Sequence, residues 1–208
     1  MIVIFEGLDN CGKTTLVQML KNYYINIGID AEVSKEFETN IGIELKKMAI
    51  EGTLDSILKA YLFAADRYIR MKSISSDDLN NKILLFDRYV PSAIAYRMAE
   101  GVDKDFVLNI NSVFPKADIG FFIDITPEES MNRNIDTKFN IKSSVEHLSK
   151  VRKAYSSILN ENNLIYIDGM KPIEQIFNEV LQKLEEFRKN NAKRIWSTNI
   201  TIKKMWNL

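Results

Sequence analysis

Apolar positions follow two patterns that alternate along the chain. Short continuous runs rich in β-branched and aromatic residues predict buried strands at residues 2–5, 31–34, 82–87, 119–124 and 164–168. Apolar residues at helical spacing predict helices at residues 14–24, 43–50, 57–74 and 172–188. Such an alternation, with strands that are apolar on both sides, is typical of a parallel sheet covered by helices on both faces. We therefore predict a doubly wound α/β fold.

Length, charge and cysteine content are those of an ordinary single-domain protein without a disulfide. The chain has 208 residues, which suits a single domain over residues 1–208, and its 28 basic residues balance its 28 acidic ones. Nothing in this balance favours nucleic acid or a membrane as partner. The single cysteine excludes an internal disulfide, no apolar run reaches membrane-spanning length, and the first residues lack signal-peptide features. We expect a cytoplasmic protein.

Residues 7–14, GLDNCGKT, match the phosphate-binding pattern G-x-x-x-x-G-K-[ST]. The pattern lies between a predicted strand and a predicted helix, a context that argues against a chance glycine-rich turn. Lys13 is expected to contact the β- and γ-phosphates, and the Thr14 hydroxyl is expected to ligate Mg²⁺. The residues expected to bind ATP are Gly7, Leu8, Asp9, Asn10, Cys11, Gly12, Lys13, Thr14 and Thr15.

Asp87 and Arg88 follow the predicted strand at residues 82–87. In this topology the strand ends beside the phosphate loop, where a carboxylate can hold the Mg²⁺ shell and a guanidinium can hold a phosphate. The alternative is a surface ion pair that closes the strand.

Phe63 and Arg67 are one helical turn apart in the predicted helix at residues 57–74. A ring and a guanidinium in this arrangement can hold a base and its 5′-phosphate. Spacing alone favours the alternative, a core phenylalanine beside a solvated charge.

Four segments together resemble one family: FEGLDNCGKTT, LFAADR, DRYVPSAIAY and DITPE followed by Arg133. In this order they are similar to thymidylate kinases, and the resemblance runs from about residue 2 to residue 184. It implies the P-loop NTPase fold with a five-stranded parallel sheet flanked by helices on both faces and a small lid. It also implies ATP with Mg²⁺ as phosphoryl donor, dTMP as acceptor, and a homodimer.

The resemblance implies an acceptor-binding segment at about residues 35–72. It also assigns acceptor-binding roles to residues outside this segment. Asp9 would contact the sugar 3′-hydroxyl, Arg88 would bind the acceptor phosphate, and Asp87 would serve the metal. The expected contacts of the base, sugar and acceptor phosphate are Lys35, Phe63, Arg67, Ser92 and Tyr96. Lys35 stands in for an arginine that many members carry.

On the donor side the resemblance places Arg133 at the root of a lid at about residues 133–143. Family members supply extra positive charge from an arginine in the phosphate loop or from arginines in the lid. Here the loop position holds Asn10, and the lid has one arginine with Lys138 and Lys142. Because an arginine at the transferred phosphoryl accelerates the reaction strongly, a weak kinase or a nucleotide-binding regulator stays an alternative.

Arg97 stands where bacterial members tend to carry glutamine. Arginine donates hydrogen bonds only, whereas glutamine donates and accepts. Arg97 is therefore counted among the acceptor-binding residues, with three outcomes open: an altered base preference, a contact with phosphate, or a side chain in solvent.

Three further features carry less weight. Cys11 is interpreted as a small filler, with an oxidation-sensitive thiol as the alternative, and His147 as a surface residue without a metal role. The basic, tryptophan-containing tail at residues 188–208 is expected to pack on its own domain or on a twin subunit, rather than on nucleic acid or a membrane.

The catalytic residues expected from sequence are Lys13, Asp87, Arg88 and Arg133, acting in direct in-line transfer from ATP to dTMP. The rival enzyme class is a deoxynucleoside kinase, whose acceptor is a hydroxyl. The two arginines Arg67 and Arg88 argue against it, because a neutral hydroxyl does not require two cations.

Overall fold

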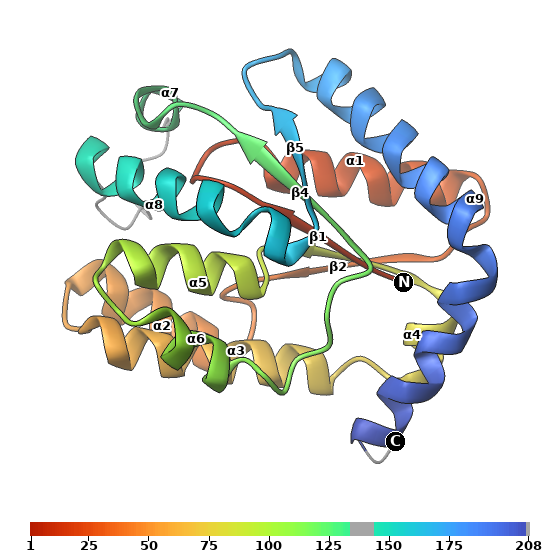
Figure 1. Cartoon of the computed structure of the whole chain (residues 1–208), viewed down its shortest axis with the longest axis horizontal. Coiled ribbons are helices and arrows are strands. Elements are labelled where there is room, and N and C mark those ends of the chain that lie inside the picture. Colours follow the sequence, from red (N-terminus) through yellow and green to blue (C-terminus); the bar gives the residue numbers. More distant parts are fainter. Residues whose placement is uncertain (134–143, 207–208) are drawn as a thin grey trace.

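A five-stranded parallel sheet forms the centre of the protein (Figure 1). The computed structural model describes the backbone of residues 1–133 and 144–206, and all side chains of these residues except 76, 80 and 192–206. The strand order is β2-β3-β1-β4-β5. The strands are β1 (Ile2–Glu6), β2 (Ala31–Lys35), β3 (Ile83–Asp87), β4 (Ile119–Asp124) and β5 (Leu164–Asp168). All five predicted strands are confirmed within a residue at each end.

The register of the strands brings their polar last residues to one edge of the sheet. The central strand β1 pairs with β3 on one side and with β4 on the other, with Phe5 opposite Asp87 and Glu6 opposite Phe122. Asp124 of β4 lies opposite Asp168 of β5. The loop after Glu6 therefore emerges between the ends of β3 and β4, where ligands bind in open α/β sheets.

Helices cover both faces of this sheet (Figure 1). One face carries α1 and α9, and the other carries α5 and α8, with α2, α3 and α6 outside α5. The helices are α1 (Lys13–Asn26), α2 (Asn40–Glu51), α3 (Ser56–Lys72), α4 (Ser76–Asn81), α5 (Val90–Ala99), α6 (Lys104–Ile110), α7 (Pro127–Asn132), α8 (Val145–Ile158) and α9 (Ile173–Trp206). A short 3₁₀ turn at Asn160–Asn162 precedes β5. The predicted doubly wound architecture is thus confirmed.

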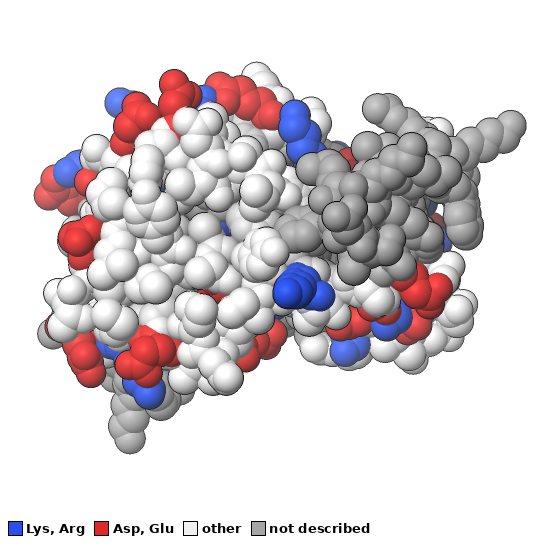
Figure 2. Space-filling model, turned by 90° about the horizontal axis from the view of Figure 1, so that it is seen from below, with Lys and Arg blue, Asp and Glu red and all other residues white. Residues whose placement is uncertain are grey.

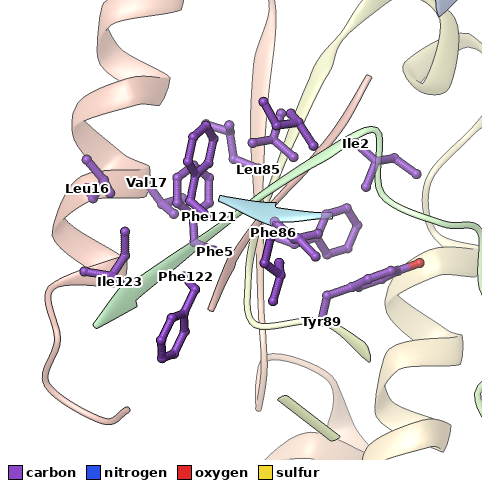
Figure 3. Close-up of a cluster of buried hydrophobic side chains, with 14 of the residues drawn as sticks. Ile2, Phe5, Leu16, Val17, Leu85, Phe86, Tyr89, Phe121, Phe122 and Ile123 are labelled. Atoms are coloured by element: carbon purple, nitrogen blue, oxygen red, sulfur yellow. The ribbon is translucent and has the colours of Figure 1, made fainter. Parts of the chain in front are cut away.

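Aromatic side chains of the sheet fill the core beneath the site (Figure 3). The rings of Phe5 and Phe121 stack across β1 and β4 with centroids 5.6 Å apart. Leu16 and Val17 of α1 pack on this cluster and are fully buried. Burial of each such side chain contributes about 1.5–3 kcal/mol, so the strand ends that position the site rest on a rigid base.

The structure adds elements that the apolar pattern did not predict. The short helices α4, α6 and α7 begin at side-chain caps from Ser75, Asp103 and Thr126, and caps give a weaker sequence signal than a long periodic stripe. The last helix was expected to end near residue 188, but α9 continues to Trp206.

The predicted lid lies almost entirely outside the described residues, since only its first residue, Arg133, is among them. Within the part of the chain that the structure covers, no helix combines the length and apolar character needed to cross a bilayer.

Candidate nucleotide-binding site

The loop between β1 and α1 is bent by two glycines with positive φ. Gly7 has φ of 142° and Gly12 has φ of 97°, conformations that other residues rarely adopt. A Cβ on Gly7 would collide with the backbone oxygen of Ile123 and with the Cys11 sulfur. The close approach of β4 and the turn into α1 therefore both require glycine. A loop of this kind at a helix N-terminus is suited to binding phosphate oxygens.

Lys13 is the first residue of α1, and its ammonium lies inside this loop. Its Nζ donates to the carbonyl oxygens of Leu8 at 2.6 Å and Gly7 at 3.2 Å, and to the Cys11 sulfur at 3.4 Å. Lys13 is buried, so these contacts satisfy a charge that would otherwise be costly to desolvate. The ammonium is thus held at the place where the loop would receive a phosphate.

Thr14 and Asp87 meet at the mouth of the loop. The Thr14 hydroxyl donates to Asp87 Oδ2 at 2.5 Å, which joins the start of α1 to the end of β3. These two oxygens are ligands of the hard kind that Mg²⁺ prefers. Among the described residues no group of three or more acidic, histidine or cysteine side chains could hold a metal alone. The donor set therefore fits an ion that takes its other ligands from nucleotide phosphates and water, as Mg²⁺ commonly does.

Arg88 follows Asp87 in the chain, and its side chain projects toward the same loop. Its Nη2 donates to Asp9 Oδ1 at 2.6 Å and to the Tyr96 hydroxyl at 3.1 Å, and its Nη1 donates to Ser92 Oγ at 3.2 Å. The backbone of Arg88 has φ of 73°, and its N–H donates to the Phe5 oxygen. This left-handed turn aims the side chain across the phosphate loop instead of along β3.

Glu6, at the end of β1, is a buried acid that orders the residues around Arg88. It accepts hydrogen bonds from the Ser92 hydroxyl, the Tyr155 hydroxyl at 3.0 Å and the Tyr89 N–H at 2.9 Å. Burial raises the pKa of the Glu6 carboxyl, although these hydrogen bonds and Arg88 act in the opposite direction. Through Ser92 and Tyr155, Glu6 fixes the orientation of the guanidinium.

A cavity extends from Arg88 along α5 and under α3. Of the residues predicted to bind the acceptor, it is lined by Asp9, Phe63, Arg88, Ser92, Tyr96 and Arg97. The structure thus brings six side chains together from the phosphate loop, α3, α5 and the connection between β3 and α5. The cavity is also lined by residues that sequence did not indicate, among them Glu36, Phe37, Lys59, Glu100 and His147.

Arg67 is not among the residues that line this cavity. Its side chain is 0 % exposed, with Nη1 donating to Asn111 Oδ1 at 2.6 Å and Nη2 to the Tyr89 oxygen at 3.2 Å. It also pairs at 3.5 Å with Glu36, which does line the cavity. The sequence predicted either a contact of Arg67 with the acceptor nucleotide or a solvated charge. The structure instead places Arg67 one layer behind the cavity wall.

Three further predicted residues, Lys35, Arg133 and Asn10, are not among those that line this cavity. Lys35 ends β2 and is absent from the cavity lining. Arg133 follows α7, where it pairs with Glu129 at 2.6 Å and donates to the Gly169 oxygen at 3.1 Å, on the donor side of the sheet edge. Asn10 donates to the Ser130 oxygen at 3.0 Å, so its amide docks the loop on α7.

The acceptor side of the cavity is closed by a junction of α2 with α3. The Thr39 hydroxyl donates to Asp66 Oδ1 at 2.6 Å and accepts from the Gly42 N–H at 3.0 Å, which caps α2. A Cβ on Gly42 would collide with this Asp66 carboxylate. The helices therefore approach closely enough to place Phe37 and Phe63 ring against ring, 5.5 Å apart.

The residues that sequence reasoning missed gave few local signals. Glu6 could have been noticed as a charge that ends an apolar strand, because a buried charge requires partners. Glu100 lies three positions after Arg97, which places them on one helix face, and this spacing was available from sequence. His147 was expected at the surface, whereas it is partly buried against the cavity.

The fold and these contacts define a class. A P-loop with its lysine, a threonine–aspartate pair suited to a metal, and a separate arginine facing the same loop are the features of a nucleotide-binding phosphotransferase. A family model described as thymidylate kinase matches residues 5–180. The chain belongs to the thymidylate kinase family.

Relatives from several archaea support this assignment. The chain is 35% identical over 181 residues to a probable thymidylate kinase of Sulfurisphaera tokodaii, a match that covers 86% of this chain and 93% of the relative. It is 32% identical over 187 residues to probable thymidylate kinase 1 of Saccharolobus solfataricus, covering 89% and 97%. A probable thymidylate kinase of Methanococcus maripaludis is 31% identical over 191 residues, covering 88% and 94%.

Proposed function

We propose that this protein transfers the γ-phosphoryl group of ATP to dTMP, giving dTDP and ADP. The observation that carries the proposal is the contact between Arg88 and Asp9, at 2.6 Å, which places an acceptor-side guanidinium directly on the donor phosphate loop. Family membership and the names of the archaeal relatives support dTMP as the acceptor.

Each side chain then has a distinct part in the transfer. Lys13 exchanges its carbonyl contacts for the β- and γ-phosphate oxygens of ATP, and Arg88 binds the acceptor phosphate with its planar fork. The two cations draw two anions together and keep them in line, so no covalent enzyme intermediate is needed. Asp9 is released from Arg88 as the acceptor phosphate binds, and its carboxylate is then free to accept from the sugar hydroxyl.

Thr14 and Asp87 would hold the Mg²⁺ ion that accompanies ATP. When bound, the ion supplies positive charge to the phosphate oxygens of the donor. The Asp87 carboxylate orients the Thr14 hydroxyl for this role, since the two already share a hydrogen bond.

A coupled assay for ADP release tests the proposal. ATP is supplied with Mg²⁺ and, in turn, with dTMP, dUMP, dCMP or thymidine. Turnover that is fastest with dTMP is the expected result. Turnover with thymidine but not with dTMP would indicate a deoxynucleoside kinase, and the absence of turnover with any acceptor would indicate a regulator.

We also propose a homodimer formed through α3. The outer side of this helix exposes an apolar stripe formed by Ile57, Leu58, Tyr61, Tyr68 and Ile69, each 38–51% exposed. Figure 2 views the molecule from the side of α2, α3 and α6, and uncharged side chains dominate the central part of that face. Exposed apolar side chains gathered along one helix are characteristic of a protein interface.

Light scattering on the purified chain tests the dimer. Tyr61→Glu places a charge in the middle of the stripe and should produce a monomer. Ile25→Glu is the matched control, because Ile25 is 49% exposed on α1, away from the stripe. A wild-type monomer, or equal effects of the two variants, would contradict the proposed interface. The cytoplasmic location suggested by the single cysteine stays a prediction, which cell fractionation would test.

A further inference from the structure

A buried hydroxyl of α8 contacts the guanidinium of Arg88 from behind the cavity wall. The Tyr155 side chain is 0% exposed, and its oxygen accepts from Arg88 Nη1 at 3.5 Å. It also lies 2.7 Å from Ser92 Oγ, which accepts from the same Nη1 at 3.2 Å. The described lining of the cavity includes neither Tyr155 nor the buried acid Glu6. Both residues therefore act on the arginine without occupying space that a ligand would fill.

The direction of the hydrogen bonds explains why an acid is buried at this point. Arg88 offers donors only, so each oxygen that faces it must present a lone pair. A hydroxyl has one proton, and Ser92 and Tyr155 both donate theirs to Glu6 Oε2, Tyr155 at 3.0 Å. Glu6 Oε1 accepts from the Tyr89 N–H at 2.9 Å, which keeps the carboxylate in this orientation. Glu6 thus draws both protons away from the arginine and leaves two acceptors facing it.

The two amino groups of Arg88 have different neighbours. Nη1 is directed at the Ser92 and Tyr155 hydroxyls. Nη2 donates to Asp9 Oδ1 at 2.6 Å and to the Tyr96 hydroxyl at 3.1 Å. An arriving phosphate is an anion and competes with the Asp9 carboxylate for Nη2, whereas the neutral hydroxyls at Nη1 are held in place from behind. One end of the guanidinium can therefore exchange its partner while the other end keeps its own.

We propose that Glu6 and Tyr155 are positioning residues, which hold Nη1 of Arg88 so that Nη2 meets the acceptor phosphate with the guanidinium already in place. The inference rests on the proposed function, in which Asp9 leaves Nη2 as the phosphate binds. A fixed guanidinium loses little conformational freedom on binding, and this preorganisation raises affinity. Burial raises the pKa of the Tyr155 hydroxyl, and the Glu6 charge raises it further, so the hydroxyl keeps the proton that it donates.

The position of Tyr155 is fixed by the sheet as well as by Glu6. One turn earlier in α8, Arg152 pairs with Asp124 at the end of β4, and its Nε and Nη2 each lie 2.7 Å from a carboxylate oxygen. The Tyr155 ring packs on Phe122 of β4, with ring centroids 5.0 Å apart. The hydroxyl is therefore held at a set distance from the strand ends on which the site is built.

Tyr155→Phe tests the inference, because it removes the hydroxyl and keeps the ring that packs on Phe122. The quantity measured, by calorimetric titration, is the ratio of the dissociation constant of thymidine to that of dTMP, which isolates the contribution of the phosphate. We expect this ratio to fall by about 5- to 10-fold, with the dissociation constant of ATP unchanged. In steady-state kinetics KM for dTMP should rise, and kcat at saturating dTMP should change much less.

Tyr24→Phe is the matched control. Tyr24 is also 0% exposed, and its hydroxyl donates to Glu185 at 2.8 Å, where α1 packs on α9. These helices lie on the opposite face of the sheet from α8 (Figure 1). The control should lose a similar amount of thermal stability and leave the ratio unchanged. An unchanged ratio in Tyr155→Phe, or an equal fall in both variants as a merely structural role would produce, would overturn the inference.

Glu6→Gln tests the same contact from the side of the acid. The amide has nearly the size of the carboxyl group, but its NH₂ would donate to the hydroxyls and turn a hydroxyl proton toward Arg88. The ratio should fall here as well. Asp118→Asn is the control, because Asp118 accepts from the Ile2 N–H at 2.7 Å at the other end of β1. A ratio that stays at the wild-type value in Glu6→Gln would show that the acid does not position the arginine.

The proposed function can fail separately, because the ratio is a binding measurement. A protein without turnover whose ratio falls in Tyr155→Phe would support the positioning role and contradict the kinase activity. A protein that phosphorylates dTMP but keeps its ratio in this variant would retain the proposed function and refute the positioning role. Equal affinity of the wild type for thymidine and dTMP would also refute it, since Arg88 would then contribute nothing to phosphate binding.

Discussion

The donor loop and the acceptor cavity differ in how they are built. Most groups of the donor loop come from one continuous stretch, from Gly7 to Thr14, and Asp87 contributes from the end of β3. The acceptor cavity combines side chains from the phosphate loop, the chain after β2, α3, α5 and α8. A contiguous loop has its geometry set by local backbone rules, whereas a composite cavity depends on how helices pack. A single substitution in the donor loop should therefore abolish most of the turnover. A single substitution in the acceptor cavity should reduce turnover or affinity only in part.

Lys13→Met should give the largest loss. It removes the ammonium that lies in the phosphate loop while keeping a similar stem. We expect kcat to fall by about 10³-fold, since positive charge on the transferred phosphoryl stabilises the transition state. Steady-state kinetics with saturating ATP and dTMP measure this, and circular dichroism confirms that the fold is intact. Turnover within about threefold of the wild type would show that the lysine has no part in transfer.

Asp87→Asn should have an intermediate effect and should change the dependence on Mg²⁺. The amide retains a hydrogen-bond acceptor for the Thr14 hydroxyl but removes the negative charge that favours a divalent ion. We expect the Mg²⁺ concentration at half-maximal rate to rise by about 10-fold or more. A Mg²⁺ titration at fixed ATP measures it, with Asp168→Asn as the control, because Asp168 ends β5, farther along the sheet order. An equal shift in both variants would contradict the assignment.

The smallest predicted effect is a shift in the titration of His147, the single histidine of the chain. Burial lowers its pKa below the usual 6.5; Glu100 acts in the opposite direction, and Arg97 and Lys59 lower the pKa further. Because the folded pKa is the lower one, the folded state loses stability relative to the unfolded state as the pH falls below about 6.5. Proton NMR can follow this one imidazole directly.

The pKa of His147 also depends on three charged residues of the cavity wall, Arg97, Glu100 and Lys59. Arg97→Met should raise the pKa of His147 by removing a cation, and Glu100→Gln should lower it by removing an anion. Lys59 and Asp9, which also influence this pKa, and the neighbouring Tyr96 ring are not substituted in either variant. Shifts in the same direction in the two variants would show that the histidine does not sense this cluster.

The fold and the donor site could be predicted from the sequence because their signals are local. Apolar runs gave all five strands, and the loop pattern gave Gly7, Lys13 and Thr14 in their observed context. Asp87 was predicted because the end of a parallel strand has a fixed relation to the loop of its neighbour. Each of these inferences needs only short-range geometry or sheet topology.

The acceptor site was only partly predictable, because side-chain direction depends on helix packing. Phe63 and Arg67 share a helix face, yet Phe63 lines the cavity and Arg67 turns inward to Asn111, a residue far away in sequence. Arg97 was left with three possible roles, and the structure buries its side chain in the cavity wall beside Phe63, which excludes only the position in solvent. The partners that decide these directions, Asn111, Glu36 and Glu100, carry no motif of their own.

The central claim is that two separate anion sites, one for each nucleotide, meet at the phosphate loop. The most direct test measures the dissociation constants of ATP and of dTMP, each alone, for Arg88→Met and for Lys13→Met. We predict that Arg88→Met weakens dTMP by about 10-fold or more and leaves ATP nearly unchanged, and that Lys13→Met does the reverse. Equal losses of both affinities in both variants would contradict the account, because they would mean that the two cations serve a single site.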